Sequence, residues 1–309
     1  MPGAPDKGAI LPRQMSFGIL MGLLASASWA AANVFVQRSS RQLGPFRALV
    51  WTQVAGGVAL APAALVLDRR SGQVDGAVAG WIAFAAVAGV IGYASMFWAY
   101  ERGRLSIVVP VLSSWSVVAS AFSLIVLHQR LRTSQLAGAA LVAMGVVVVS
   151  RFARKADGGA EGAAGPSPGP RRSRGALLAA ACAALGFGLL IPVIDRLAPV
   201  FGRLGTIPIV FASDLVLGLP LAALARVDLR FPPRAAWPSV LAAALFETIG
   251  FVWISLGVAR APVAIVSPFA GLASAFTVAF AWFALGERPA RPLFAGVVLV
   301  CAGVVVLAL

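Results

Sequence analysis

The stretch LSIVVPVLSSWSVVASAFSLIVL, residues 105–127, returns in altered form as VAIVSPFAGLASAFTVAFAWFAL at residues 263–285. Each copy is apolar and long enough to cross a bilayer as a helix. Aligned at an offset of 158 residues (263 minus 105), the copies match Pro110 with Pro268, Ser116 with Ser274, Ala121 with Ala279, Phe122 with Phe280, and Leu127 with Leu285. The chain therefore contains an internal repeat of a membrane-spanning segment.

The same offset relates positions well outside this segment. It matches Arg38 with Arg196, Pro62 with Pro220, Gly92 with Gly250, Arg102 with Arg260, Arg130 with Arg288, Ala137 with Ala295, Gly138 with Gly296, Gly145 with Gly303, and Val146 with Val304. Because prolines, arginines and glycines recur in one register, chance similarity between apolar helices is a poor explanation. The sequence predicts two similar halves, residues 16–150 and 175–309.

Residues 151–174 separate the halves and differ from them in composition. They include ADGGAEGAAGPSPGP at residues 156–170, with basic residues on both sides. Such a Gly/Ala/Pro-rich segment is typical of a flexible linker and cannot build a core. We predict that this linker is disordered and dispensable for membrane insertion.

The composition indicates a membrane protein. Hydrophobic residues make up 60% of the 309-residue chain, charged residues 12%, and the mean hydropathy is +0.91. A soluble domain carries about a quarter of charged residues, so the lipid bilayer is the expected surrounding. The net charge of +14 does not indicate nucleic-acid binding, because the basic residues lie in short gaps between apolar runs.

Ten apolar stretches predict an all-α integral membrane protein with ten transmembrane helices. They lie at residues 17–36, 48–67, 78–100, 105–127, 136–149, 176–194, 206–224, 237–258, 263–285 and 293–309. Each half has five spans, an odd number, so the second half enters the membrane from the opposite side. This predicts two inverted five-helix repeats, an architecture of secondary transporters. Which terminus faces the cytoplasm stays open.

Short motifs add a family resemblance. The second half has Ala261-Pro262, then Pro268, then Leu-Gly-Glu-Arg at residues 285–288, then Gly296 and Gly303. This pattern, with the similar segment at residues 100–150, resembles the EamA domain of the drug/metabolite transporter superfamily. In the first half His128 and Gln129 replace the Gly and Glu of the pattern. A role of the motif glutamate is therefore available only at Glu287; the alternative for Glu287 is an ordinary charge pair at a helix end.

Together the inverted repeat and the resemblance imply a secondary active transporter that works by alternating access. The resemblance implies an exporter of amino acids or other small metabolites, and the Arg-, Ala- and Gly-rich composition suggests a bacterial plasma membrane. The alternatives are an intramembrane lipid-modifying enzyme and a non-transporting membrane partner. The enzyme is disfavoured because the chain has one histidine, His128, and two cysteines in apolar runs, Cys182 and Cys301. No metal site or cofactor is expected.

Two acidic residues lie inside predicted spans. Asp214 is in the seventh and Glu247 in the eighth, and neither has a Lys or Arg within four residues. An acid in hydrocarbon costs about 2.5–3.5 kcal/mol on insertion scales, so such residues usually serve a function. Their repeat counterparts are Gly56 and Gly89, so the fold itself does not need them. We predict that either acid couples transport to protons; the alternative is a neutral acid bonded to a neighbouring helix.

Prolines and aromatic residues complete the predicted site. Pro110 and Pro268 are expected to kink two equivalent helices towards a central cavity. The residues predicted to bind substrate are Trp29, Asn33, Tyr93, Trp98, Ser113, Trp115 and Ser267. For each aromatic residue the alternative is core packing, and Trp81 and Tyr100, near span ends, are expected in the aromatic belt at the membrane surface.

The expected partners are a small-molecule substrate and the lipid bilayer. Gly138 and Gly145, like Gly296 and Gly303, are seven residues apart and share a helix face. Such faces suit close packing within one chain or between two chains, which leaves a homodimer open.

Overall fold

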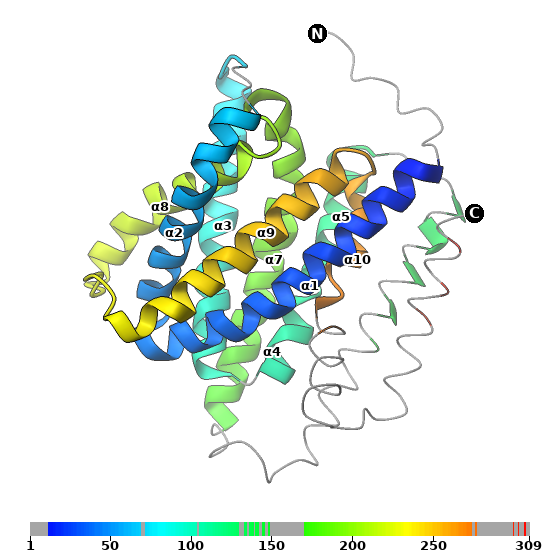
Figure 1. Ribbon diagram of the computed structural model, residues 1–309. Coiled ribbons are helices and arrows are strands. Elements are labelled where there is room, and N and C mark those ends of the chain that lie inside the picture. Colours follow the sequence, from blue (N-terminus) through cyan, green and yellow to red (C-terminus); the bar gives the residue numbers. More distant parts are fainter. Residues whose placement is uncertain are drawn as a thin grey trace.

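The computed structural model describes residues 12–68, 72–103, 105–129 and 170–273, with scattered positions between 133 and 148 and between 276 and 306 (Figure 1). Within these residues every regular element is helical and no strand occurs. In chain order they are α1 (Pro12–Leu43), α2 (Pro45–Leu67), α3 (Gly76–Arg102), α4 (Leu105–Leu112), α5 (Trp115–Ile125), α7 (Pro170–Phe201), α8 (Thr206–Leu224), a 3-10 turn (Arg234–Ala236), α9 (Trp237–Val258) and α10 (Val263–Ala270). The all-α class is confirmed for the described part of the chain.

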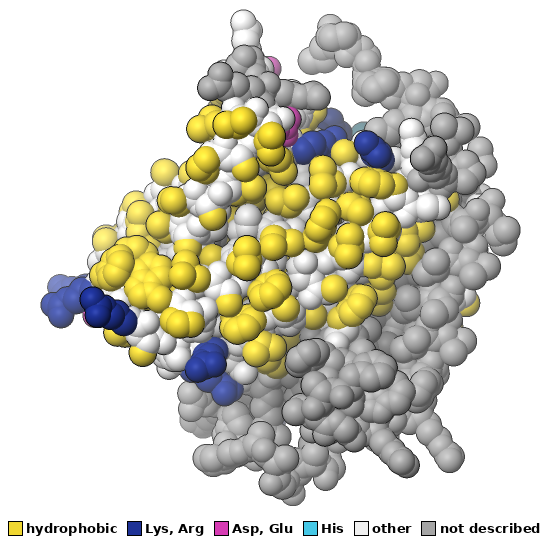
Figure 2. Space-filling model, in the orientation of Figure 1, with side chains coloured by type: hydrophobic (Ala, Val, Ile, Leu, Met, Phe, Trp, Pro, Cys, Tyr) yellow, Lys and Arg dark blue, Asp and Glu magenta, His cyan; other side chains and the backbone are white. Residues whose placement is uncertain are grey.

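Six of the described helices are long and apolar enough to cross a membrane: α1, α2, α3, α7, α8 and α9. On the face seen in Figure 2, hydrophobic side chains spread over α1, α2 and α9, and Lys and Arg side chains gather at the margins. A broad apolar surface between basic margins is the pattern of a protein embedded in lipid. The protein is therefore a multi-pass α-helical membrane protein. Only scattered positions of the predicted fifth and tenth spans are among the described residues, so the count of ten spans stays a prediction.

Local sequence signals explain several helix ends. Gly44, with a φ of 80°, makes the turn between α1 and α2, and Pro45 then occupies the first turn of α2. Asp75 caps α3, since its carboxylate accepts a hydrogen bond from the backbone N–H of Val78 at 2.8 Å. α8 and α9 begin and end where the sequence predicts them. α7 instead begins at Pro170, inside the residues predicted as linker, because Pro suits the first turn of a helix.

The predicted spans at residues 105–127 and 263–285 are interrupted at equivalent places. The first divides into α4 and α5 at Ser113 and Ser114. α10 ends just before Gly271, the position 158 residues after Ser113. Pro110 and Pro268 lie about one turn before each break. The sequence predicted kinks at these prolines; the structure has short turns one helical turn later, with Ser114 and Gly271 still in the right-handed helical region.

The two broken helices touch each other at their breaks. A Cβ at Gly271 would collide with the side chain of Ser116 and would lie 3.2 Å from the Ser113 carbonyl oxygen. Pro268 leaves the carbonyl of Ala264 without its usual helical donor, and the hydroxyl of Ser120 in α5 lies 3.4 Å from it. The same hydroxyl is closer to the Ser116 carbonyl, at 2.8 Å, so its one proton is shared between an acceptor in its own helix and one in the other half. The breaks are therefore held together by contacts between the two halves.

Most helix packing joins one half to the other. α1 packs mainly along α9, as Figure 1 shows, and α3 packs mainly along α7. In the repeat register α1 corresponds to α7 and α3 to α9. The α1–α9 pair and the α3–α7 pair are therefore equivalent contacts related by the repeat. α3 and α7 approach so closely that a Cβ at Gly186 would collide with the backbone of Gly92. The buried centre of the molecule is thus built from both halves.

Candidate functional site

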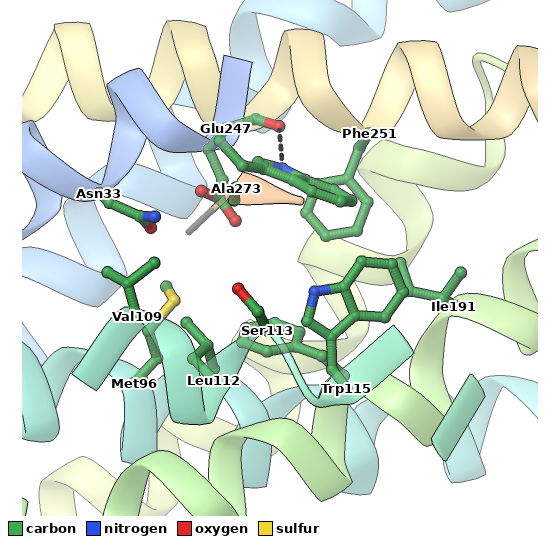
Figure 3. Close-up of a pocket in the computed structure, with 12 residues that line it drawn as sticks. Asn33, Met96, Val109, Leu112, Ser113, Trp115, Ile191, Glu247, Phe251 and Ala273 are labelled. Carbon is green, nitrogen blue, oxygen red and sulfur yellow. Dashed lines mark hydrogen bonds between the residues drawn. The ribbon is translucent and has the colours of Figure 1, made fainter. Parts of the chain in front are cut away.

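A cavity lies in this buried centre, and Figure 3 shows the twelve residues that line it. The cavity has an empty volume of about 450 Å³, including its mouth. Its walls come from α1, α3, α4, α5, α7, α9 and the break between α4 and α5, so both halves contribute. The lining residues are Trp29, Asn33, Met96, Val109, Leu112, Ser113, Trp115, Phe187, Ile191, Glu247, Phe251 and Ala273.

Half of these residues form pairs related by the internal repeat. At the offset of 158, Trp29 corresponds to Phe187, Asn33 to Ile191, and Trp115 to Ala273. The cavity thus lies where equivalent faces of the two halves meet. The chemistry of its walls is nevertheless asymmetric, because the first half supplies polar or larger aromatic side chains at all three positions.

Trp29 is fixed in place by contacts with both halves. Its ring packs edge-on against Trp115, with ring centres 5.6 Å apart, and against Phe251 at 5.3 Å. Its indole N–H donates to the backbone carbonyl of Glu247 at 3.3 Å. A Cβ at Gly250 would collide with the indole, so glycine at 250 makes the space for the ring. The result is a rigid aromatic wall able to stack on a planar or cationic group.

The polar groups gather at the other end of the cavity. Figure 3 places Asn33, Glu247 and Ser113 around one end, with Trp115, Phe251 and Ile191 around the other. The side-chain oxygen of Asn33 accepts a hydrogen bond from the Tyr100 hydroxyl at 2.7 Å, which fixes the amide. Glu247 is buried, and no ion pair involves it among the described residues. This end can therefore accept the positive charge and N–H groups of a substrate or hold a proton.

Tyr93 connects this cavity with the second intramembrane acid. Its buried ring packs edge-on against Phe187, with ring centres 4.8 Å apart, and contacts Phe251 on the other side. Its hydroxyl interacts electrostatically with the carboxyl groups of both Glu247 and Asp214, but has no hydrogen bond of normal geometry. Asp214 itself does not line the central cavity.

The remaining predicted residues are more scattered. Ser267 and Pro268 are buried in α10 without lining the cavity, and Pro110 lies in α4. Trp98 lies outside the cavity, where the Arg102 guanidinium stands 4.3 Å from its ring centre. Glu287 lies outside the described residues.

The expectation for Tyr100 was wrong. It does not lie in an aromatic belt, because its side chain is fully buried and bonds Asn33. Its position near a span end suggested the membrane surface, but that end of α3 faces protein. A buried phenol needs a partner, and Asn33 supplies it.

The apolar half of the wall was not predicted from the sequence. Phe187, Ile191 and Ala273 resemble many other apolar residues of the spans. The repeat register does contain the signal, since adding 158 to Trp29, Asn33 and Trp115 gives these three positions. Within the described residues no cluster of three or more His, Cys, Asp or Glu side chains is placed to hold a metal ion.

Comparison with known proteins gives three findings. The sequence pattern described as the EamA-like transporter family matches residues 16–151 and 174–309. A protein of Methanocaldococcus jannaschii, described as uncharacterized, is 26% identical over 136 residues, which are 44% of this chain and 98% of that protein. A solved crystal structure superposes with a TM-score of 0.66 at 21% identity, covering 94% of this chain and 96% of the other, and so supports the fold.

Proposed function

Because the chain belongs to the EamA-like transporter family, we propose that it is a secondary active transporter working by alternating access. The family match and the apolar helices make the chain a multi-pass membrane transporter of the drug/metabolite transporter superfamily. We further propose that its substrate is an amino acid or another small metabolite. The direction is export across a bacterial plasma membrane, which the sequence resemblance and composition suggested.

The proposed architecture is ten spans in two inverted repeats. The family match in each half supports the repeat, and contacts along the helices support the inversion. The end of α1 meets the end of α3, since Gln37 and Arg41 both donate to the Gly103 carbonyl at 3.2 Å. A Cβ at Gly103 would also lie 3.2 Å from Ala176, near the start of α7. The start of α7 therefore lies near the end of its counterpart α1, as opposed orientations require.

The observation that carries the proposal is the central cavity with Glu247 in its wall. Repeat-equivalent residues of both halves surround it, so a rocking of one half against the other would change the side on which it opens. Aromatic rings form one end, and Glu247, Asn33 and Ser113 form the other. These groups suit a small metabolite with an ammonium group and an apolar part, which is the chemistry of many amino acids.

Glu247 also offers a physical basis for coupling to protons. A buried carboxylate is stable only with a compensating positive charge, supplied by a substrate ammonium group or by a bound proton. If the two compete for one carboxyl group, export of the substrate is exchanged for entry of a proton. Asp214, the other predicted proton carrier, lies outside this cavity, and a proton role for it stays a prediction.

The test is flux in proteoliposomes containing the purified protein, with mixtures of amino acids and other small metabolites. We expect a pH gradient to drive accumulation in the wild type. Glu247→Gln keeps the shape but cannot ionise, so it should abolish gradient-driven accumulation while substrate exchange persists. Glu101→Gln is the matched control, because Glu101 pairs with Arg102 at the end of α3, away from the cavity. Full accumulation by Glu247→Gln would refute the coupling role, and absence of flux for every substrate class would favour the enzyme or partner alternatives.

A further inference from the structure

A second cavity lies between α2, α3 and α8, apart from the central one. Its volume is about 1010 Å³ when the open space at its mouth is counted, and it follows one face of each helix. Along α8 its lining runs from Asp214 to Ala225, the residue that follows the helix, about 16 Å at 1.5 Å per residue. On α2 it runs from Phe46 to Gln53. We call it the lateral groove.

The inner end of the lateral groove is polar. Asp214 is only 3% exposed, and its Oδ2 accepts a hydrogen bond from the Gln53 amide at 3.1 Å. Its Oδ1 has no hydrogen-bond partner among the described residues and lies against Gly89 of α3, where a side chain at 89 would be. No Lys or Arg in the described part of the chain pairs with Asp214. A carboxyl group is thus buried at the inner end of the groove with unused hydrogen-bonding capacity.

The outer part of the groove is apolar and reaches the surface that faces lipid. Phe46, Ile91 and Leu221 line it and are 38%, 47% and 48% exposed. The start of α2 and the end of α8 form its outer end, where the exposed Arg230 and the Arg47–Asp228 pair mark the membrane surface. The groove therefore leads from the membrane surface to a carboxyl group deep in the bilayer.

We propose that the lateral groove is a binding site for a membrane-dissolved amphiphilic amine. The ammonium group would donate N–H hydrogen bonds to the Asp214 carboxyl group, which lines the inner end, and compensate its charge, and the alkyl chain would lie along the apolar walls. A primary or secondary amine fits better than a quaternary one, because the unused Oδ1 requires a donor. An extended chain of about 16 Å matches the length of the groove.

The other half of the molecule provides a natural comparison. A groove of about 820 Å³ lies between α2 and α9, and its Ile249 and Val252 are the repeat counterparts of Ile91 and Ala94. There Gly56 replaces the acid at 214, and Leu60 replaces Gly218. The counterpart groove thus has a similar place and shape but lacks the carboxyl group. Amine binding should be confined to the lateral groove.

The test uses the full chain in lipid nanodiscs, a photoreactive alkylamine, and mapping of labelled peptides by mass spectrometry. We expect saturable labelling of α2, α3 and α8 that dodecylamine competes away and dodecanol does not. Asp214→Asn should reduce labelling about tenfold, as expected for loss of a hydrogen bond to a charged group. Gly218→Leu should reduce it similarly by filling the groove, and a Cβ there meets only Val90, at 3.7 Å, so the variant should fold. Ala59→Leu in the counterpart groove is the matched control and should label as the wild type does.

Several results would overturn the proposal. These are wild-type labelling in both Asp214→Asn and Gly218→Leu, equal competition by dodecanol, equal labelling of the α2–α9 groove, or no saturable labelling. If Asp214→Asn does not fold, Gly218→Leu alone decides. The site is separate from the central cavity, and the readout is binding, so its failure and a failure of the proposed transport function are distinguishable.

Discussion

Asp214 and Gly89 form a matched pair across α8 and α3. The Asp214 carboxyl group fills the space in which a side chain at 89 would lie. The repeat counterpart of Asp214 is Gly56 and that of Gly89 is Glu247, so the second half has both acids and the first half both glycines. The Asp214 carboxyl group fits where it lies because residue 89 on the facing helix has no Cβ.

Gly89→Ala tests this pairing. The added Cβ would displace the Asp214 carboxyl group and disturb its hydrogen bond with Gln53, so the free energy of unfolding should fall by about 1–3 kcal/mol. In the double variant Gly89→Ala/Asp214→Ala the clash is absent, and the loss should be smaller than the sum of the single losses. Unfolding in detergent measures both. Gly218→Ala on the same groove is the control with little expected effect, and strictly additive losses would contradict the pairing.

Polar and large aromatic residues within apolar runs were the sequence signal for the site, and most but not all of them line the cavity. Trp29, Asn33, Ser113, Trp115 and Glu247 line the cavity, and each interrupts an apolar run with a polar or large aromatic group. Trp98 has the same appearance but packs beneath Arg102, because its helix face points away from the cavity. A sequence shows that a residue is unusual, but only packing decides which face of the helix meets the partner half.

At the scale of helices, the paired breaks in the fourth and ninth spans are the distinctive element. Apolar length fixed the bounds of α8 and α9, since each is a single uninterrupted span. It did not predict that residues 105–127 divide into α4 and α5, because a proline can bend a helix or end it. The outcome depends on whether neighbouring groups can satisfy the freed carbonyls, as the Ser120 hydroxyl, 3.4 Å from the Ala264 carbonyl, is placed to do in part.

A double-mutant cycle tests the role of Ser120. Ser120→Ala removes the hydroxyl that lies 2.8 Å from the Ser116 carbonyl and 3.4 Å from the Ala264 carbonyl, and it should lower the free energy of unfolding by about 1 kcal/mol in the wild-type background. In a Pro268→Ala background residue 268 can itself donate to that carbonyl, so the same substitution should cost less. Ser123→Ala is the control, because its hydroxyl bonds only within α5, to the Ala119 carbonyl. Equal costs of Ser120→Ala in both backgrounds would show that Ser120 does not compensate for the proline.

At the scale of the whole molecule, the largest contacts of each half are with helices of the other half. The linker at residues 151–174 stays a prediction from composition, whereas the repeat was readable from the sequence, since it depends on residue identity. The packing of α1 on α9 and of α3 on α7 was not, because apolar spans carry little information about their partners. Nearly the whole relative from Methanocaldococcus jannaschii aligns with 136 residues of this chain, about the length of one half. A protein of about the length of one half therefore occurs as a separate chain.

Splitting the chain within residues 151–169 tests this view. Two co-expressed fragments, each carrying one half, should assemble through the α1–α9 and α3–α7 contacts, and a tag on one fragment should purify both. Each fragment expressed alone should give little folded protein. Replacing residues 151–169 with a Gly/Ser linker of equal length is the control, and it should preserve membrane yield and transport. Failure of the fragments to associate would show that the linker contributes to the fold.

Because α1 packs along α9, its final contacts cannot form during biosynthesis until α9 has been made. A ribosome adds roughly 5–20 residues per second, and the roughly 200 residues from the end of α1 to the start of α9 therefore take about 10–40 seconds. During that delay the Trp29 indole lies in the bilayer without its acceptor, the Glu247 carbonyl, whereas Asn33 and Gln37 can already bond Tyr100 and Gly103 at the end of α3, which is made earlier. The nascent protein must shelter this indole elsewhere, beside the insertion machinery or against other early helices. A membrane insertase that retains α1 until α9 emerges would meet this need.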